Sequence, residues 1–151
     1  MGLDLLEEFQ RITRGLDDAG VPYAVVGALA VAIHGAPRAT TDIDLLVAPQ
    51  DVTRALEVAR QQGFSFEGLP MRFPDGMELR RTTKIEGADT LTLDLILVDD
   101  NLKATWESRR SLATDWGAVW VVSREALLKM KAAAGRPRDL GDIASLEEID
   151  R

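Results

Sequence analysis

The sequence contains no cysteine and only one histidine, and these two shortages exclude several kinds of site. Without cysteine there is no disulfide, no thiolate ligand for zinc and no thiol nucleophile. A single histidine excludes metal sites that are rich in imidazole. Long apolar stretches are missing as well, because no uninterrupted run approaches the roughly 18 residues that a membrane-spanning helix needs.

Basic residues are outnumbered, with 18 Lys and Arg against 25 Asp and Glu and a net charge of −7. Broad binding to DNA or RNA depends on Lys and Arg that neutralise phosphates, so we do not expect it. The first ten residues, MGLDLLEEFQ, carry acids where a secretory signal would carry basic residues. We therefore expect a cytoplasmic protein, with no membrane contact, that folds as one domain over residues 1–151.

Two hydrophobic periodicities follow one another along the chain and predict a mixed α+β (α/β) fold. Helix-like steps of three and four residues occupy the first segment, and strand-like alternation occupies several later ones. The two strands that flank Gly87 are expected to pair as a hairpin. We expect helices over residues 3–16, 28–33, 51–62, 100–110 and 123–134 and a short one ending at 150, and strands over residues 23–26, 42–47, 64–66, 77–84, 90–98 and 119–122.

Capping and turn residues predict where these elements end. Asp51 and Ser123 are expected to cap helices, because a side-chain oxygen at this position accepts a free backbone N–H of the first turn. Residues 68–76 contain Gly and Pro and are expected to form a loop. Gly135, Pro137 and Gly141 are expected to break the chain between its last two helices.

Three carboxylates lie in or beside apolar strands, where ionised groups are unfavourable. Asp42 and Asp44 are two positions apart in a predicted strand, so both point to the same face and repel each other. Asp94 interrupts a strand with leucine at alternate positions. A partly buried ion without a counter-charge costs several kcal/mol. A divalent cation removes this cost most simply, and Mg²⁺ is favoured because it takes oxygen ligands and keeps water and phosphates in its shell.

Gly27 stands at the predicted junction between a strand and a helix. Backbone N–H groups at such a junction can point toward an anion, and the helix dipole adds to the attraction. Packing and turn geometry are the alternative reasons for a glycine at this place.

The segments Val25-Val26-Gly27-Ala28 and Arg38-Ala39-Thr40-Thr41-Asp42-Ile43-Asp44-Leu45 together resemble the signature of the nucleotidyltransferase superfamily, whose simplest members are the minimal nucleotidyltransferases. The preceding helix, the Asp94 strand and the late region 136–139 look like the layout of the AbiEii-type and lincosamide/aminoglycoside branches. The resemblance implies a mixed β-sheet flanked by helices, with a small helical cap at the C-terminus.

The resemblance also implies roles for these residues. Asp42 and Asp44 would bind Mg²⁺, with two ions or Mn²⁺ as variants, against the triphosphate of a nucleoside triphosphate donor. Asp94 would be the third metal ligand or the base that deprotonates the acceptor hydroxyl. Gly27 and Ala28 would hold the leaving phosphates through backbone N–H groups. Ala28 departs from the family pattern, which has Ser or Gly there, so a hydroxyl contact is missing while backbone donation is retained.

Several basic residues are candidates for binding phosphate. Arg38 could reach a phosphate or pair with Asp42. Lys131 is preferred among the late cations, because related branches place a phosphate-binding lysine on a helix beyond the third carboxylate; pairing with the C-terminus of its helix is the alternative. Three more form a cluster that either binds phosphates or is solvated: Arg80, Arg81 and Lys84.

The sequence does not identify the acceptor. The family's acceptors include small antibiotics, RNA ends and protein side chains, and a partner protein or a second copy could complete the acceptor site. The alternative function is that of a toxin-antitoxin or phage-defence component that acts mainly by binding a partner. The remaining polar and aromatic candidates are expected to be structural: His34 at a helix end, and Trp106, Trp116 and Trp120 as core or edge fillers.

Overall fold

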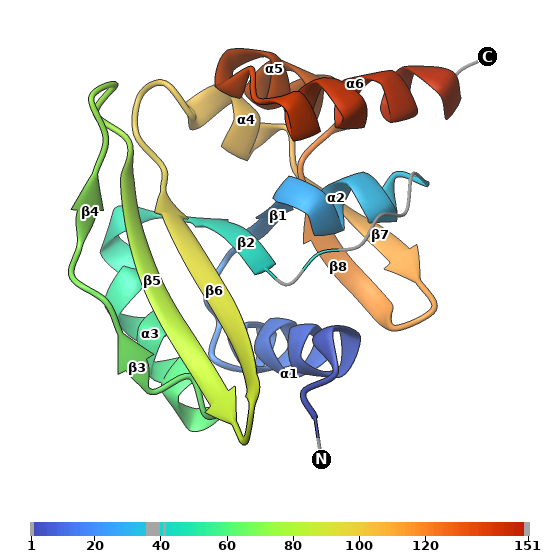
Figure 1. The fold of residues 1–151 in the computed structure, drawn as a ribbon. Helices are drawn as coiled ribbons and strands as arrows, with labels where there is room; N and C mark the ends of the chain where they lie inside the picture. Colours follow the sequence, from blue (N-terminus) through green and yellow to red (C-terminus); the bar gives the residue numbers. More distant parts are fainter. Residues whose placement is uncertain (1, 36–39, 41, 150–151) are drawn as a thin grey trace.

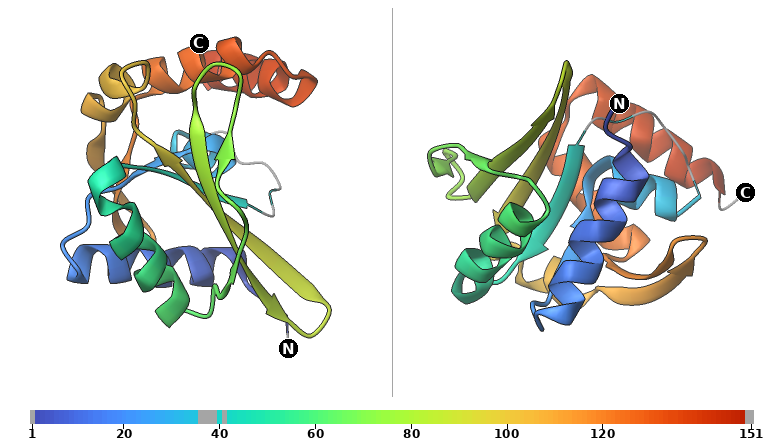
Figure 2. Two further views of the ribbon diagram at one scale, coloured as in Figure 1. Left: turned by 90° about the vertical axis from the view of Figure 1, so that its left-hand side faces the viewer. Right: turned by 90° about the horizontal axis from the view of Figure 1, so that it is seen from below.

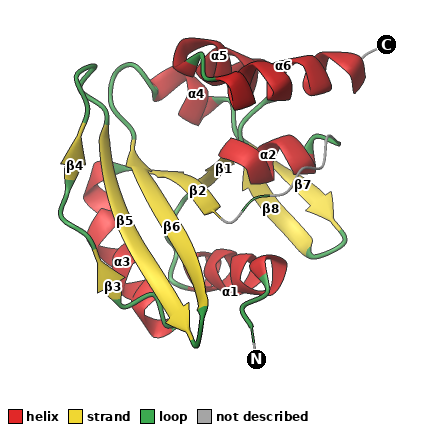
Figure 3. Cartoon of the chain, in the orientation of Figure 1, coloured by secondary structure: helices red, strands yellow, loops and turns green. Residues whose placement is uncertain are grey.

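The computed structural model describes residues 2–35, 40 and 42–149 (Figure 1). Helices and strands are interspersed along the chain, and the chain ends with two helices, as Figure 3 shows by colour. The helices are α1 (Leu5–Asp18), α2 (Gly27–Ile33), α3 (Val52–Gln61), α4 (Lys103–Glu107), α5 (Arg124–Ala134) and α6 (Pro137–Ile149), with a 3₁₀ turn η1 (Pro49–Asp51) before α3. The strands are β1 (Ala24–Val26), β2 (Asp42–Val47), β3 (Phe66–Glu67), β4 (Met71–Arg72), β5 (Glu78–Glu86), β6 (Asp89–Leu97), β7 (Arg110–Thr114) and β8 (Gly117–Val121).

All strands of the described residues join one mixed sheet in the order β3-β5-β6-β2-β1-β8-β7, with β4 also paired to β5. β2 runs parallel to β6 and antiparallel to β1, and β1 runs parallel to β8. Helices α1 and α3 lie at one side of the molecule, and α5 and α6 lie at the opposite side (Figure 2). This arrangement confirms the predicted mixed sheet flanked by helices, with a helical C-terminal end.

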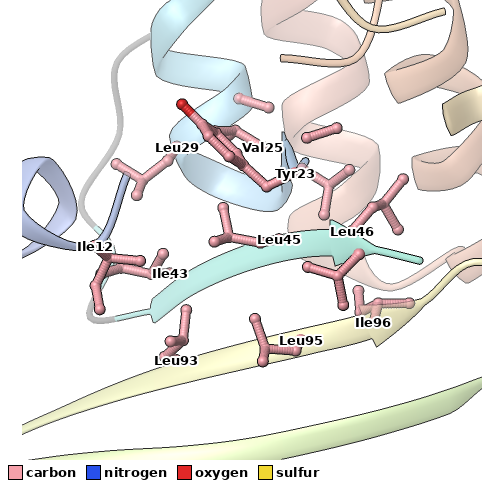
Figure 4. Packing of buried hydrophobic residues seen from close by; sticks show 14 of the residues in the cluster. Ile12, Tyr23, Val25, Leu29, Ile43, Leu45, Leu46, Leu93, Leu95 and Ile96 are labelled. Carbon is pink, nitrogen blue, oxygen red and sulfur yellow. The ribbon is translucent and has the colours of Figure 1, made fainter. Parts of the chain in front are cut away.

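The alternation along β2 separates core from site. Ile43 and Leu45 are fully buried, whereas Asp42 and Asp44 on the other face keep some exposure. Ile12 of α1 lies beside Ile43, and Leu95 of β6 belongs to the same cluster of buried side chains (Figure 4). Each such aliphatic side chain contributes roughly 1.5–3 kcal/mol when it is fully buried. The apolar face of β2 therefore anchors the strand, and its polar face is free to carry function.

Local signals explain three of the helix ends. Asp4 caps α1 by accepting the N–H of Glu7 at 2.9 Å, and Ser123 caps α5 as predicted by accepting the N–H of Ala126 at 3.1 Å. α5 ends where Gly135 adopts a left-handed conformation with φ of 64°. Among the residues described, no helix is both long and apolar enough to cross a bilayer.

Several expected elements differ from those observed. The helix expected over 100–110 is only α4, and Arg110 already begins β7, because the Ser108 hydroxyl donates to Thr105 O at 2.6 Å as the helix ends. Asp51 makes no cap hydrogen bond and pairs instead with Arg54 at 2.7 Å. The loop expected over 68–76 contains β4, and Gly141 lies inside α6 rather than breaking the chain before it.

Candidate active site

The register between β2 and β6 brings the three predicted carboxylates to one face of the sheet. Asp44 is paired with Asp94, and Asp42 is paired with Thr92. Side chains at paired positions of neighbouring strands point the same way, and the strands lie roughly 4.8 Å apart. The sequence placed Asp42 and Asp44 on one face, and the structure adds Asp94 to that face beside Asp44.

Gly27 touches this cluster from the β1–α2 junction. Val26 is paired with Asp44 across the sheet, and Gly27 follows with a positive φ of 70°. A side chain at position 27 would overlap Oδ2 of Asp44 and would lie 3.1 Å from its Cβ. Both the backbone conformation and the available space therefore require glycine. Ala28, the next predicted phosphate contact, has its side chain buried in α2.

Asp44 is a largely buried carboxylate that the described basic residues compensate only in part. Burial raises the pKa of Asp44 most, and the charges of Asp94 and Asp42 raise it further, to about 6. Lys131 and Arg138 oppose this shift without cancelling it. The site therefore presents a carboxylate whose ionised form would be stabilised by an added cation.

Asp94 is held by an arginine on the neighbouring strand. Arg81 of β5 is paired in register with Asp94, donating from Nε to Oδ1 at 2.8 Å and from Nη2 to Oδ2 at 2.9 Å. Asp94 is buried, whereas Arg81 is about half exposed at 47%. The hydrogen bond to Asp94 is the main reason why the pKa of Arg81 is raised. Both oxygens of Asp94 are thus engaged by one guanidinium.

The donor chemistry fits a divalent cation at Asp42 and Asp44, because hard cations take carboxylate oxygens and the charge of Asp44 is only partly compensated. Within residues 2–35, 40 and 42–149, however, no three Asp, Glu, His or Cys side chains are arranged to hold one metal ion. Asp94, the third predicted ligand, is engaged by Arg81. Ligation by all three predicted residues, Asp42, Asp44 and Asp94, remains a prediction that requires Asp94 to leave Arg81.

Lys131 lies in a buried ion cluster between α5 and α6. Its Nζ is 3.0 Å from Asp142 Oδ2 and 3.4 Å from Asp139 Oδ1. Burial opposes ionisation of Asp139, but hydrogen bonds from Arg136 and the charge of Lys131 outweigh it and lower the pKa of Asp139. Lys131 therefore has carboxylate partners, although its charge still acts on Asp44. Its predicted role in binding phosphate stays a prediction.

The other basic candidates divide between the two faces of the sheet. Lys84 points away from the carboxylates, with Nζ 3.0 Å from both oxygens of buried Glu8 and 2.9 Å from Gln62 O. Arg80 alternates with Arg81 and also points away from them. Only Arg81 of the predicted basic cluster thus faces the site. Arg38 lies outside the described residues.

The sequence analysis missed the pairing of Arg81 with Asp94. The signal was present, because counting outward from the turn around Gly87 places these two residues opposite each other. His34 and two of the three tryptophans have the structural partners that were expected. The His34 ring Nε2 donates to Val122 O at 2.9 Å, Trp116 packs edge-on against Phe9, and Trp106 stacks under Arg109.

Comparisons with known proteins bear on the fold and the family of the chain. Three solved structures share the fold over nearly the whole chain at low identity. The lincosamide antibiotic adenylyltransferase LnuA, bound to lincomycin, has a TM-score of 0.66 at 16% identity, covering 95% of this chain and 96% of its own. ANT(2")-Ia in complex with adenylyl-2"-tobramycin has a TM-score of 0.64 at 15% identity, covering 93% and 86%. An antigenic nucleotidyltransferase-like protein from Paracoccidioides brasiliensis has a TM-score of 0.60 at 18% identity, covering 95% and 77%.

Among the curated proteins, none matches the sequence. A family model does match it, over residues 2–139, and its description is "Uncharacterised nucleotidyltransferase". The match contains Gly27, the Asp42–Asp44 strand and Asp94. The chain therefore belongs to this nucleotidyltransferase family.

Proposed function

We propose that the protein transfers a nucleoside monophosphate from a nucleoside triphosphate to a hydroxyl group, in a reaction that depends on Mg²⁺. The observation that carries this proposal is the placement of Asp42, Asp44 and Asp94 on one face, with Gly27 packed against Asp44. The charge of Asp44 is only partly compensated, and Gly27 beside it has no side chain that would block a ligand. This combination suits a cation that carries the phosphates of a nucleotide.

Each residue has a distinct part in the proposal. Asp42 and Asp44 would hold the cation, which would neutralise the triphosphate and the leaving pyrophosphate. In the transfer, the acceptor oxygen bonds to the α-phosphorus and the bond to pyrophosphate breaks. The hydroxyl proton passes to a carboxylate, for which Asp94 is the candidate.

The triphosphate would be bound from two sides. Backbone N–H groups of Gly27 and Ala28 would face it at the β1–α2 junction. Lys131 and Arg138, which both act electrostatically on Asp44, lie on the α5–α6 side, and Arg38 is a further candidate. LnuA and ANT(2")-Ia are described with lincomycin and adenylyl-2"-tobramycin. ATP and small hydroxyl-bearing molecules are therefore the first donor and acceptors to test, before RNA ends and protein side chains.

A melting experiment tests the donor half of the proposal. Each nucleoside triphosphate is added with Mg²⁺ or Mn²⁺, and the correct one should stabilise the fold by about 2.7 kcal/mol at a concentration 100 times its Kd. Asp44→Asn should abolish this ligand-induced shift, whereas Asp115→Asn, in the exposed β7–β8 turn, should retain it. A melting temperature unchanged by all four nucleotides would contradict the proposal and favour a role in binding a partner.

The acceptor half needs a transfer assay. Radiolabel from the α-phosphate of the stabilising nucleotide should appear on one acceptor class among aminoglycosides, lincosamides, RNA and protein. The label should be lost with Asp44→Asn and kept with Asp115→Asn. Label released only as free nucleoside monophosphate would show hydrolysis and would contradict transfer.

A further inference from the structure

Arg81 donates two hydrogen bonds to Asp94, a carboxylate of the proposed active site. Its planar guanidinium donates to the two oxygens of Asp94 at 2.8 and 2.9 Å. A contact through two parallel hydrogen bonds is stronger and more directional than a single ion pair. The cross-strand register of β5 and β6 fixes the two residues opposite each other. The contact is therefore built into the hairpin.

A divalent cation and Arg81 need the same carboxylate. The guanidinium engages both oxygens, and a cation that approached the remaining lone pairs of Asp94 would lie beside a positive charge. Arg81 also feels the charges of Asp42 and Asp44. Arg81 thus supplies counter-charge to the cluster when no cation is bound, and it does so through Asp94.

We propose that Arg81 is a positioning residue that keeps Asp94 out of the coordination of the cation, so that a cation is taken by Asp42 and Asp44 without Asp94. This inference rests on the proposed function, because it takes Asp42 and Asp44 as the cation site. Held in this way, Asp94 stays oriented at the edge of the site, where an acceptor hydroxyl would approach. Without Arg81, Asp94 becomes a third oxygen donor to the same cation.

The consequence is opposite to that of an ordinary loss of an active-site residue. Removing Arg81 should tighten the binding of a divalent cation rather than weaken it. Losing the partner of a metal-ligating group ordinarily lowers metal affinity by roughly 10- to 100-fold. Arg81 acts in the opposite sense, because its removal gives the site one more ligand, and we expect a gain of about tenfold, at the lower end of that range.

The test is a titration with Mn²⁺ alone, followed by electron paramagnetic resonance, on the full chain without nucleotide. Arg81→Gln should bind Mn²⁺ about tenfold more tightly than the unmodified protein. Arg80→Gln is the matched control, because it removes the same charge from the next position on the opposite face and should leave the affinity unchanged. Arg81→Lys should lie between, because an ammonium lacks the planar fork that holds both oxygens of Asp94 in one orientation.

A double variant tests whether the gain depends on Asp94, and Arg81→Lys, which keeps the positive charge, tests whether it depends on more than a lost charge. The gain should disappear when Arg81→Gln is combined with Asp94→Asn, and part of it should remain in Arg81→Lys. A gain that survives in the double variant would overturn the proposal, and so would an Arg81→Gln affinity equal to or weaker than that of the unmodified protein. Circular dichroism checks folding, and Arg81→Lys carries the test if Arg81→Gln does not fold.

Asp44→Asn distinguishes a failure of the proposed role of Arg81 from a failure of the proposed function. If Asp44→Asn binds Mn²⁺ as well as the unmodified protein, the cation site itself is wrong. If Asp44→Asn loses binding while Arg81→Gln gains none, the cation site stands and the role of Arg81 is wrong.

Discussion

Replacing Asp44 by Asn should stabilise the protein when no cation is present, although it removes a residue of the proposed active site. Burial and the charges of Asp94 and Asp42 raise the pKa of Asp44 to about 6 from its ordinary value of 3.8. The ionised carboxylate is therefore less favourable in the folded protein than in the unfolded chain. Asparagine has nearly the same shape and carries no charge, so it removes this penalty.

The size of the effect follows from the pKa. Raising a pKa from 3.8 to about 6 corresponds to about 3 kcal/mol, since each unit is worth about 1.4 kcal/mol. For a domain of this size, that amount raises the melting temperature by roughly 6–12 °C. We take this as an upper value, because Asp44 retains some exposure.

The pH dependence has a definite sign. Between pH 4 and 6 the folded protein holds a proton on Asp44 that the unfolded chain has released. The stabilisation by this proton is complete below pH 3.8 and is lost as the pH rises through about 6. The advantage of Asp44→Asn should therefore be small at pH 4 and largest at pH 7–8.

The assay is chemical denaturation of both proteins from pH 4 to 8 with a chelator present, with Asp115→Asn as the control. Asp115 lies in the exposed β7–β8 turn, so its variant should follow the unmodified protein at every pH. An Asp44→Asn protein that is less stable at pH 8, or a difference that does not change with pH, would refute the reasoning. Saturating Mg²⁺ should reduce the difference, because a bound cation favours the ionised carboxylate.

Three further changes test other parts of the structure. Lys84→Met should cost about 3 kcal/mol in urea denaturation, because Glu8 stays buried without its main partner, and adding Glu8→Gln should restore much of the loss. Gly27→Ala should cost about 1–3 kcal/mol through its positive φ, and by pushing Asp44 aside it should also abolish the nucleotide-induced melting shift; an unaffected shift would contradict the packing described here. Ser123→Ala should lower stability by about 1 kcal/mol through the lost α5 cap, whereas Ser123→Asp should preserve it.

The elements around the site were predictable from the sequence because their signals are local. The strand from Asp42 to Val47 was predicted with its observed bounds, since β-branched and leucine residues alternate with the two aspartates and Pro49 follows. The hairpin around Gly87 was equally clear. Gly27 was identified at a strand–helix junction, but its contact with Asp44 required the sheet order.

Features that depend on contacts between distant segments were not predictable in the same way. Arg110 to Thr114 carries no strong alternation and becomes a strand by pairing with β8. Lys84 lies on the face of the sheet that α1 covers, and there it pairs with buried Glu8. Lys131 pairs with Asp139 and Asp142 because α6 packs against α5. In both cases the ion partner of a lysine is chosen by tertiary packing.

The charge arrangement around Asp44 explains why the described basic residues compensate this carboxylate only in part. Arg81 is engaged by Asp94, and Lys131 is engaged by Asp139 and Asp142, and all three of these carboxylates are buried, with exposures of 5%, 0% and 4%. Moving Arg81 to Asp44 would leave buried Asp94 without its bidentate partner, which costs several kcal/mol. Arg138 is exposed, so water screens its charge. A cation from solvent leaves all these ion pairs intact. Asp44, whose charge is only partly compensated, is therefore the place where such a cation would bind.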